Sequence, residues 1–161
     1  MFLSMLKRGY LKLTPKMKRL LILSCSNTKK KSKDLLPAIE RYDGINYRVI
    51  KKLQREGNFP DELDIGIISA KYGFLTPDIP IEYYDQKMTR KRALELQPEV
   101  SSELNEFLQN NGYSKIFVNL GKEYRLLLNG FDNAVSADYA EGSIGQKASQ
   151  MKKWILSLNS K

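Results

Sequence analysis

Small polar residues, with lysines, tyrosines and acids among them, close or follow three apolar runs at 19–24, 63–70 and 115–120 and a weaker run at 133–138. They are Ser24, Cys25, Ser26, Asn27 and Lys29; Ser69, Lys71, Tyr72 and Gly73; Asn119, Gly121 and Tyr124; and Asp138, Tyr139, Glu141, Gly142 and Ser143. Small side chains let a ligand approach the backbone, and lysines supply point charges for an anion. The pattern predicts a pocket for an anion or a nucleobase, although turns and caps at strand ends favour the same residue types.

Aromatic residues gather in the segment 71–88, which Gly73, Pro77 and Pro80 predict to be largely loop. They are Tyr72, Phe74, Tyr83 and Tyr84. Such rings can stack on a nucleobase, or they can anchor an irregular loop in the core.

The chain has no histidine and a single cysteine, Cys25. The absence of histidine excludes Ser-His and Cys-His nucleophile pairs and most zinc sites. No tight acidic motif suggests a metal, and we expect no cofactor. Cys25 is a nucleophile only if Lys29 or a helix N-terminus favours its thiolate, and most lone cysteines are packing residues. The catalytic candidates are therefore Ser24, Lys71 and Glu141, with Glu82, Asp85 and Asp138 as further acids.

The net charge of +9 is concentrated at the start of the chain. Residues 1–33 hold ten Lys or Arg and no acid, whereas residues 34–161 hold 17 basic and 18 acidic residues. Such a segment attracts phosphate backbones without reading base sequence, or it only keeps the protein in solution. The candidate backbone contacts are Lys12, Lys16, Lys18, Lys30, Lys31 and Lys33. "SCSNTKK" is not a Walker-type phosphate loop, because it contains no glycine.

The four apolar runs have strand length and alternate with helical patterns at 35–44, 45–57, 89–112, 121–130 and 145–158. In the second helix the residues at helical spacing on one face are Ile45, Tyr47 or Arg48, Ile50 and Leu53. In the third, Thr89 and Gly112 suit the two caps, and Pro98 predicts a break or kink. Continuous apolar strands between helices predict an α/β domain with a mostly parallel or mixed sheet and helices on both faces. We expect a single domain at 19–161 after a basic extension at 1–18, with Met17 as an alternative start.

Several motifs together resemble the YaaA family of peroxide-stress proteins, and more closely its short phage and archaeal relatives. The resemblance covers about residues 19–156. It rests on "LLILSCSNTKK", on "IGIISAKYGFLTPDIPIEYYDQKMT", on the pair Tyr42 and Gly44, on Ser69, Tyr72, Gly73 and Leu75 with Tyr83 or Tyr84, on Asn119 and Tyr124, and on Lys147 and Ala148. It implies a YaaA-like fold, association with DNA and ligand-binding roles for Tyr42, Gly44 and Tyr84.

Three functions are consistent with these patterns. We expect a protein that associates with nucleic acid or a nucleotide. We expect it to be cytoplasmic, because no apolar run approaches the roughly 20 residues of a membrane span. The first alternative is an enzyme acting on a nucleobase or nucleotide by base exchange, N-glycosidic cleavage or ligation. The second is an interaction module without a site.

Overall fold

The computed structural model describes residues 18–129 and 136–159. The expectations for the extension 1–17, for Lys12 and Lys16, for Met17 as a start and for residues 133–135 therefore lie outside the described residues. The main sheet contains β1 (Arg19–Ser24), β3 (Leu63–Ser69), β4 (Gly73–Leu75), β6 (Lys115–Asn119) and β7 (Ser136–Tyr139), and β2 (Leu36–Pro37) pairs with β5 (Pro80–Ile81). The helices are α2 (Ala38–Arg41), α3 (Ile45–Arg55), α4 (Arg90–Asn111), α5 (Lys122–Arg125) with a 3-10 turn η1 (Leu126–Leu128), and α6 (Ile144–Ser157).

The sheet has the strand order β4-β3-β1-β6-β7, with β1 at its centre. β1 is parallel to β3 and to β6, and β6 is parallel to β7. β4 alone among these strands runs antiparallel to its neighbour, β3. The expected mostly parallel, mixed sheet is confirmed.

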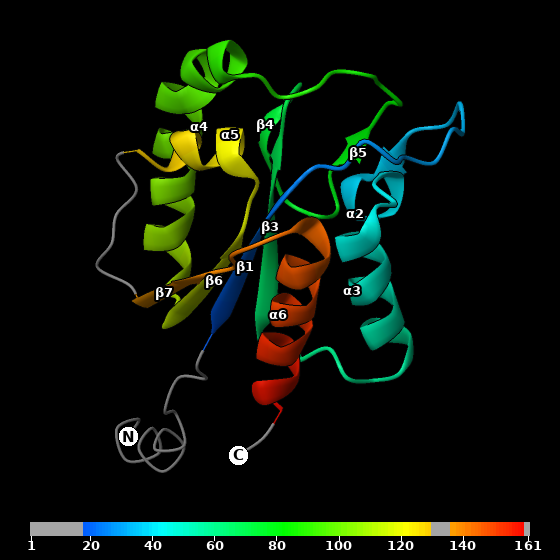
Figure 1. Ribbon diagram of the computed structural model, residues 1–161, viewed down its shortest axis with the longest axis vertical. Coiled ribbons are helices and arrows are strands. Elements are labelled where there is room, and N and C mark those ends of the chain that lie inside the picture. The colour runs from blue at the N-terminus through cyan, green and yellow to red at the C-terminus, as the bar shows by residue number, and fades with distance from the viewer. Residues whose placement is uncertain (1–17, 130–135, 160–161) are drawn as a thin grey trace, which may run out of the picture.

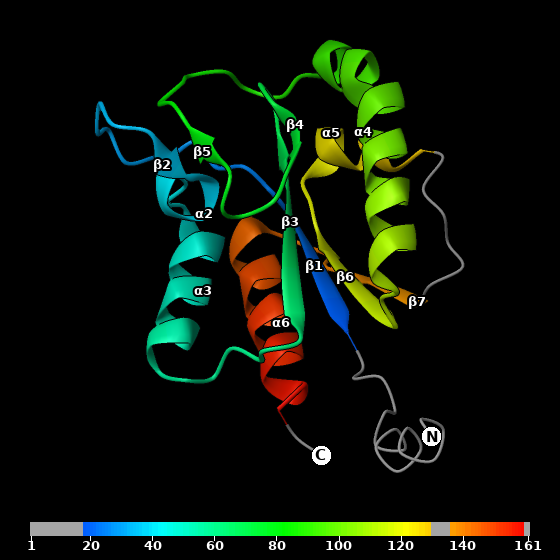
Figure 2. The ribbon, with the colours of Figure 1, turned by 180° about the vertical axis from the view of Figure 1, so that it is seen from behind.

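Helices cover both faces of the sheet, as the apolar strands predict (Figure 1). Leu21 and Leu23 of β1 point into a core formed with α3 and α6. Leu20 and Ile22 point into the opposite core, formed with α4. All four side chains are fully buried. The view from behind places α4 on one side of the sheet, and α3 and α6 on the other (Figure 2).

The ends of β1 and β6 diverge, because their connections leave toward opposite faces. After β1 the chain passes through α3 to β3. After β6 it enters α5 and η1, whose Tyr124 and Leu127 belong to the core under α4. β3 and β6 lie on opposite sides of β1, so the strand order reverses at the β1–β6 boundary. In open α/β sheets such a switch point leaves a crevice outside the carboxyl ends of the strands.

Three local expectations need correction. Ile45 is 45% exposed rather than in the core, because it is the first residue of α3, and the buried face of that helix is formed by Tyr47, Ile50 and Leu53. Helix α4 continues through Pro98 instead of breaking there, since its buried residues on both sides of Pro98 hold it to the sheet. Gly44 is the N-cap of α3 and does not end the helix before it, which stops at Arg41.

The caps of α4 are those expected. The Thr89 side chain accepts a hydrogen bond from the Arg92 N–H (3.1 Å). Gly112 has φ of 64°, the left-handed conformation that glycine adopts without steric cost.

The loop that joins β1 to β2 depends on Arg41, a residue that no sequence motif marked. This guanidinium is fully buried. It donates to the carbonyls of Lys30 (2.6 Å), Ser32 (3.0 Å), Asp34 (2.5 Å) and Ile81 (3.1 Å). One side chain therefore ties the lysine-rich loop to β5.

Gly66 in β3 gives a test of this packing. A Cβ there would lie 2.9 Å from Cε1 of Phe74 on β4, closer than side chains tolerate. We predict that Gly66→Ala lowers the free energy of unfolding by about 1–3 kcal/mol, because the Phe74 ring must move. Urea denaturation measures this. Gly145→Ala in α6 is the control, since its Cβ would meet nothing within 4 Å; we expect it to be neutral or slightly stabilising. Equal midpoints for Gly66→Ala and the wild type would contradict the packing described.

Candidate functional site

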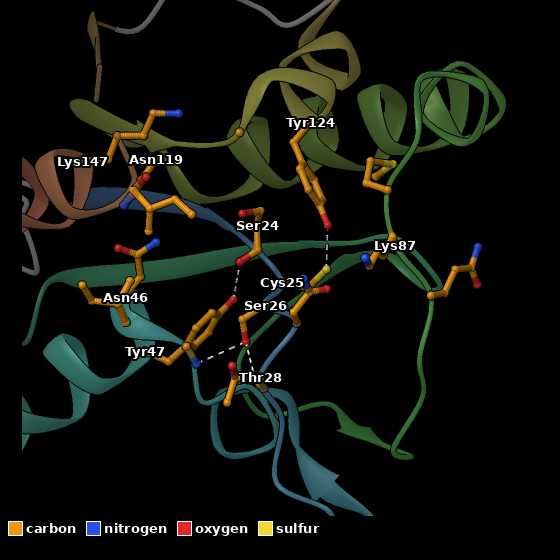
Figure 3. A pocket seen from close by; sticks show the side chains of 17 residues that line it. Ser24, Cys25, Ser26, Thr28, Asn46, Tyr47, Lys87, Asn119, Tyr124 and Lys147 are labelled. Atoms are coloured by element: carbon orange, nitrogen blue, oxygen red, sulfur yellow. Dashed lines mark hydrogen bonds between the residues drawn. The ribbon is translucent and has the colours of Figure 1, made fainter. Parts of the chain in front are cut away.

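A pocket of about 460 Å³ lies where the switch point predicts a crevice, at the carboxyl ends of β1 and β6 (Figure 3). Its size is typical of sites for small ligands. It is formed by the turn after β1, the first turn of α3, the segment before α4, the turn after β6 and the first turn of α6. The lining residues are Ser24, Cys25, Ser26, Asn27, Thr28, Gly44, Ile45, Asn46, Tyr47, Gln86, Lys87, Met88, Asn119, Gly121, Tyr124, Ile144 and Lys147.

Ser26 joins the turn after β1 to the start of α3. Its hydroxyl donates to the Thr28 carbonyl (2.6 Å) and accepts from the Gly44 N–H (3.2 Å). A Cβ at Gly44 would lie 2.8 Å from the Cβ of Ser26, so a glycine is needed for this close approach. The pair explains why a serine and a glycine far apart in the sequence belong to one site.

The floor of the pocket is polar and buried. Tyr47, 1% exposed, donates its hydroxyl to the Ser24 carbonyl (2.7 Å). Asn119, 2% exposed, donates from Nδ2 to the sulfur of Met151 (3.5 Å), which is a weak acceptor. Asn119 can therefore exchange this contact for a stronger one with a ligand.

The charge around the pocket favours an anion. Among the described residues that line it, none is an aspartate or a glutamate, whereas Lys87 and Lys147 both contribute. Lys147 donates to the Leu120 carbonyl (2.9 Å), which holds its ammonium group beside the end of β6. Helices α3 and α6 both begin at the pocket, and each contributes the positive end of its dipole. No side chain caps the start of α3, because its N-cap residue is Gly44.

Cys25 forms one wall together with Tyr124. The Cys25 sulfur and the Tyr124 hydroxyl share a hydrogen bond of 2.9 Å, drawn as a dashed line in Figure 3. Burial raises the pKa of Tyr124 well above its ordinary value, and the neighbouring Cys25 adds to the effect. The tyrosine therefore stays neutral at physiological pH and remains a hydrogen-bonding group.

The predicted ligand residues divide into two groups. The pocket is lined by Ser24, Cys25, Ser26, Gly44, Asn119, Gly121 and Tyr124. Outside its lining lie Lys29, Tyr42, Ser69, Lys71, Tyr72, Gly73 and Tyr84. The expectation that Ser24 and Ser69 share one pocket does not match this arrangement, because the end of β3 turns directly into the antiparallel β4.

Four residues of the second group, Tyr42, Ser69, Tyr72 and Tyr84, form what we call the tyrosine cluster. Tyr72 is partly buried and the other three are buried. The Tyr84 hydroxyl lies 2.5 Å from that of Tyr42 and 2.9 Å from that of Ser69, within hydrogen-bonding distance of both. The Ser69 oxygen also accepts from the N–H groups of Lys71 (3.1 Å) and Tyr72 (3.0 Å). These contacts order the turn after β3. They support the interpretation that the aromatic residues anchor an irregular loop.

Two lysines lie over the rings of the tyrosine cluster. The Lys29 ammonium is 4.5 Å from the ring centre of Tyr84, and that of Lys71 is 5.3 Å from the ring centre of Tyr72. Burial lowers the pKa of Lys29, while Cys25 and Asp85 act in the opposite direction. Lys29 is 8% exposed, so in this conformation it stabilises the cluster by cation–π contact rather than presenting its charge to solvent.

Of the three catalytic candidates, only Ser24 lines the pocket. Lys71 lies over the tyrosine cluster, and Glu141 pairs with Arg125 at 3.3 Å on the surface. Lys18, a candidate backbone contact, lies 3.6 Å from a carboxylate oxygen of Asp64. Lys30, Lys31 and Lys33 are exposed in the loop held by Arg41.

Sequence reasoning missed several lining residues, of which Asn46, Tyr47 and Lys87 matter most. Asn46 and Tyr47 belong to the first turn of α3, and although the helical pattern from residue 45 predicted this turn, nothing in the sequence shows that it lies beside the end of β1. Lys87 lies in a segment without periodic structure. Lys147 was noted only through the family resemblance, and its place in the first turn of α6 gives it a position at the pocket.

Comparison with known proteins shows the family. The family model described as "Family of unknown function (DUF6884)" matches residues 20–155, which include four strands of the main sheet and all of β1 except its first residue. The chain belongs to this family. No curated protein matches it in sequence.

The crystal structure of AF0587, a protein of unknown function, shares the fold with a TM-score of 0.55 and 16% sequence identity. The similarity covers 91% of this chain and 46% of that one, so the chain spans about half the length of that protein.

No helix among residues 18–129 and 136–159 is both long enough and apolar enough to cross a membrane. Within the same ranges, no group of three or more Cys, Asp or Glu side chains could hold a metal ion.

The buried tyrosines predict a loss of stability in alkali. Burial raises the pKa values of Tyr42, Tyr84 and Tyr124 above the ordinary value, whereas unfolded tyrosine ionises near pH 10. Above about pH 10 the unfolded state therefore loses protons that the folded state keeps, and the free energy of unfolding falls as the pH rises. We expect urea midpoints that are nearly constant from pH 8 to 9 and fall steeply from pH 10 to 11.

Substitutions locate this effect. Tyr42→Phe/Tyr84→Phe should make the decline above pH 10 shallower, since two of the responsible hydroxyls are gone. Tyr83→Phe is the control, because Tyr83 is 42% exposed. A decline of the same steepness in the double variant and the wild type would show that these tyrosines are not its cause.

Proposed function

We propose that the protein binds a phosphate-bearing ligand of the nucleotide class in the pocket between the ends of β1 and β6. The observation that carries the proposal is the pocket's charge: two lysines and no described carboxylate among its lining residues. Asn119 and the unblocked first turn of α3 add hydrogen-bond donors. Phosphate groups bind at helix N-termini for the same physical reason.

The arrangement favours binding over catalysis. Lys71 and Glu141 lie outside the pocket lining, which leaves Ser24 without an acid or base from the candidate set. Asp85 and Glu82 are also absent from the lining among the described residues. A nucleotide sensor or carrier is therefore better supported than base exchange, glycosidic cleavage or ligation.

Nucleic acid is the second candidate partner, on the evidence of charge. Residues 1–33 include ten basic residues and no acidic one. Lys30, Lys31 and Lys33 are exposed, and they lie in a loop that the hydrogen bonds of Arg41 hold in place. Such a loop supports contact with phosphate backbones without base readout. The resemblance of the sequence motifs to the YaaA family, which implies DNA association, is a second and separate reason for this prediction.

The first experiment tests the pocket. Isothermal titration with inorganic phosphate and nucleoside monophosphates should detect binding to the wild type. Lys147→Gln should weaken that binding about tenfold or more, because a charged hydrogen bond is lost. Lys152→Gln is the matched control, an exposed lysine on the same helix, and should change affinity less than twofold. Equal effects of the two variants, or no binding to the wild type, would refute the proposal.

The second experiment tests the backbone contact. DNA and RNA are titrated at several salt concentrations, and log K is plotted against log salt. Replacing Lys30, Lys31 and Lys33 with Gln should reduce the slope by roughly 0.7–0.9 for each lost phosphate contact. Replacing the exposed Lys52, Lys152 and Lys153 should leave the slope unchanged. Binding that does not depend on salt, or equal slopes for both triple variants, would exclude the contact.

A further inference from the structure

The mouth of the pocket is apolar, in contrast to its floor. Ile45 is the first residue of α3 and Ile144 the first residue of α6, and they are 45% and 71% exposed. Both line the pocket, as does the partly buried Met88. We call Ile45, Met88 and Ile144 the apolar rim.

The position of the isoleucines makes their exposure unusual. The first turn of a helix favours acidic residues and proline, which match the free N–H groups and the helix dipole. Single exposed apolar residues are common on protein surfaces. Here two bulky side chains occupy the same position of two neighbouring helices, and both border one cavity. A group that covers both would remove their apolar surface from water, which is favourable.

Next to the rim lies an amide with an unmet hydrogen bond. Oδ1 of Asn46 is buried and has no hydrogen-bond partner within the described part of the chain. Buried polar atoms are nearly always paired in folded proteins. Figure 3 shows the Asn46 side chain pointing toward Asn119 across the pocket. A ligand with a hydrogen-bond donor beside its apolar part would provide the missing partner after a rotation of this side chain.

Floor and rim together define a ligand with two unlike ends. The floor offers Asn119 and the Lys147 ammonium to an anion, while the rim offers apolar contact with an adjacent amide acceptor. From this juxtaposition we infer that the pocket takes a nucleoside monophosphate with its phosphate at the floor and its base against Ile45 and Ile144. The inference rests on the proposed function and adds the orientation of the ligand and the residues that select for a base. A bare phosphate or a sugar phosphate would leave the rim in water.

The experiment compares three probes, which are inorganic phosphate, ribose 5-phosphate and AMP, each titrated calorimetrically. We expect the wild type to bind AMP at least about tenfold more tightly than ribose 5-phosphate. Ile45→Ser/Ile144→Ser should remove most of that difference and leave the affinity for ribose 5-phosphate within about twofold. Ile79→Ser is the matched control, since Ile79 is 42% exposed and does not line the pocket; it should change none of the three affinities. Far-ultraviolet circular dichroism checks that each variant is folded.

The outcomes separate this inference from the proposal on which it rests. If none of the probes binds the wild type, and GMP, CMP and UMP also fail to bind, then both the proposed function and the rim's role are wrong. If sugar phosphate and nucleotide bind equally, the proposed function stands and the apolar rim does not select a base. The same conclusion holds if the isoleucine variant weakens ribose 5-phosphate and AMP to the same extent.

Discussion

Strand β1 is buried on both faces and paired on both edges, and the site follows from this constraint. A strand in that position cannot carry an unpaired polar side chain, because burial without a partner costs free energy. Leu20, Leu21, Ile22 and Leu23 are accordingly fully buried. The first residues free to be polar are those at the carboxyl end, Ser24 and its successors. The reversal of strand order between β1 and β6 then opens space at that point, so the polar residues meet a cavity rather than a neighbouring chain segment.

The pocket and the tyrosine cluster are two results of the same geometry. On the β6 side of β1 the strand neighbours are parallel, and their loops diverge to leave a cavity. On the other side, β3 turns back into β4, so the space is filled by side chains. Tyr84 occupies it and bonds to Tyr42 and Ser69. The segment from Tyr84 then leads directly to Gln86, Lys87 and Met88 on the pocket wall. The cluster therefore positions a wall of the pocket without lining it.

The sequence was informative wherever burial controls residue choice, and less so where two distant segments meet. Continuous apolar runs predicted β1, β3 and β6 nearly to the residue, and Thr89 and Gly112 predicted the ends of α4. Of the polar residues expected at the strand ends, Ser24, Ser26, Asn119 and Tyr124 line the pocket. Ser69 was grouped with these residues because the sequence does not reveal that β4 runs antiparallel to β3. Lys87 was missed because no periodicity marks a loop. Ile45 was placed in the core because its spacing matches that of the buried face of α3.

The most direct test of the ligand site is the pattern of amide shifts in ¹⁵N-labelled protein titrated with AMP. If the pocket between β1 and β6 binds the nucleotide, the largest shifts will come from residues 24–28, the first turns of α3 and α6, and residues 119–121. Shifts confined to the exposed loop at Lys30–Lys33, or spread evenly over the surface lysines, would show that the anion binds by surface charge alone and that the pocket is not its site.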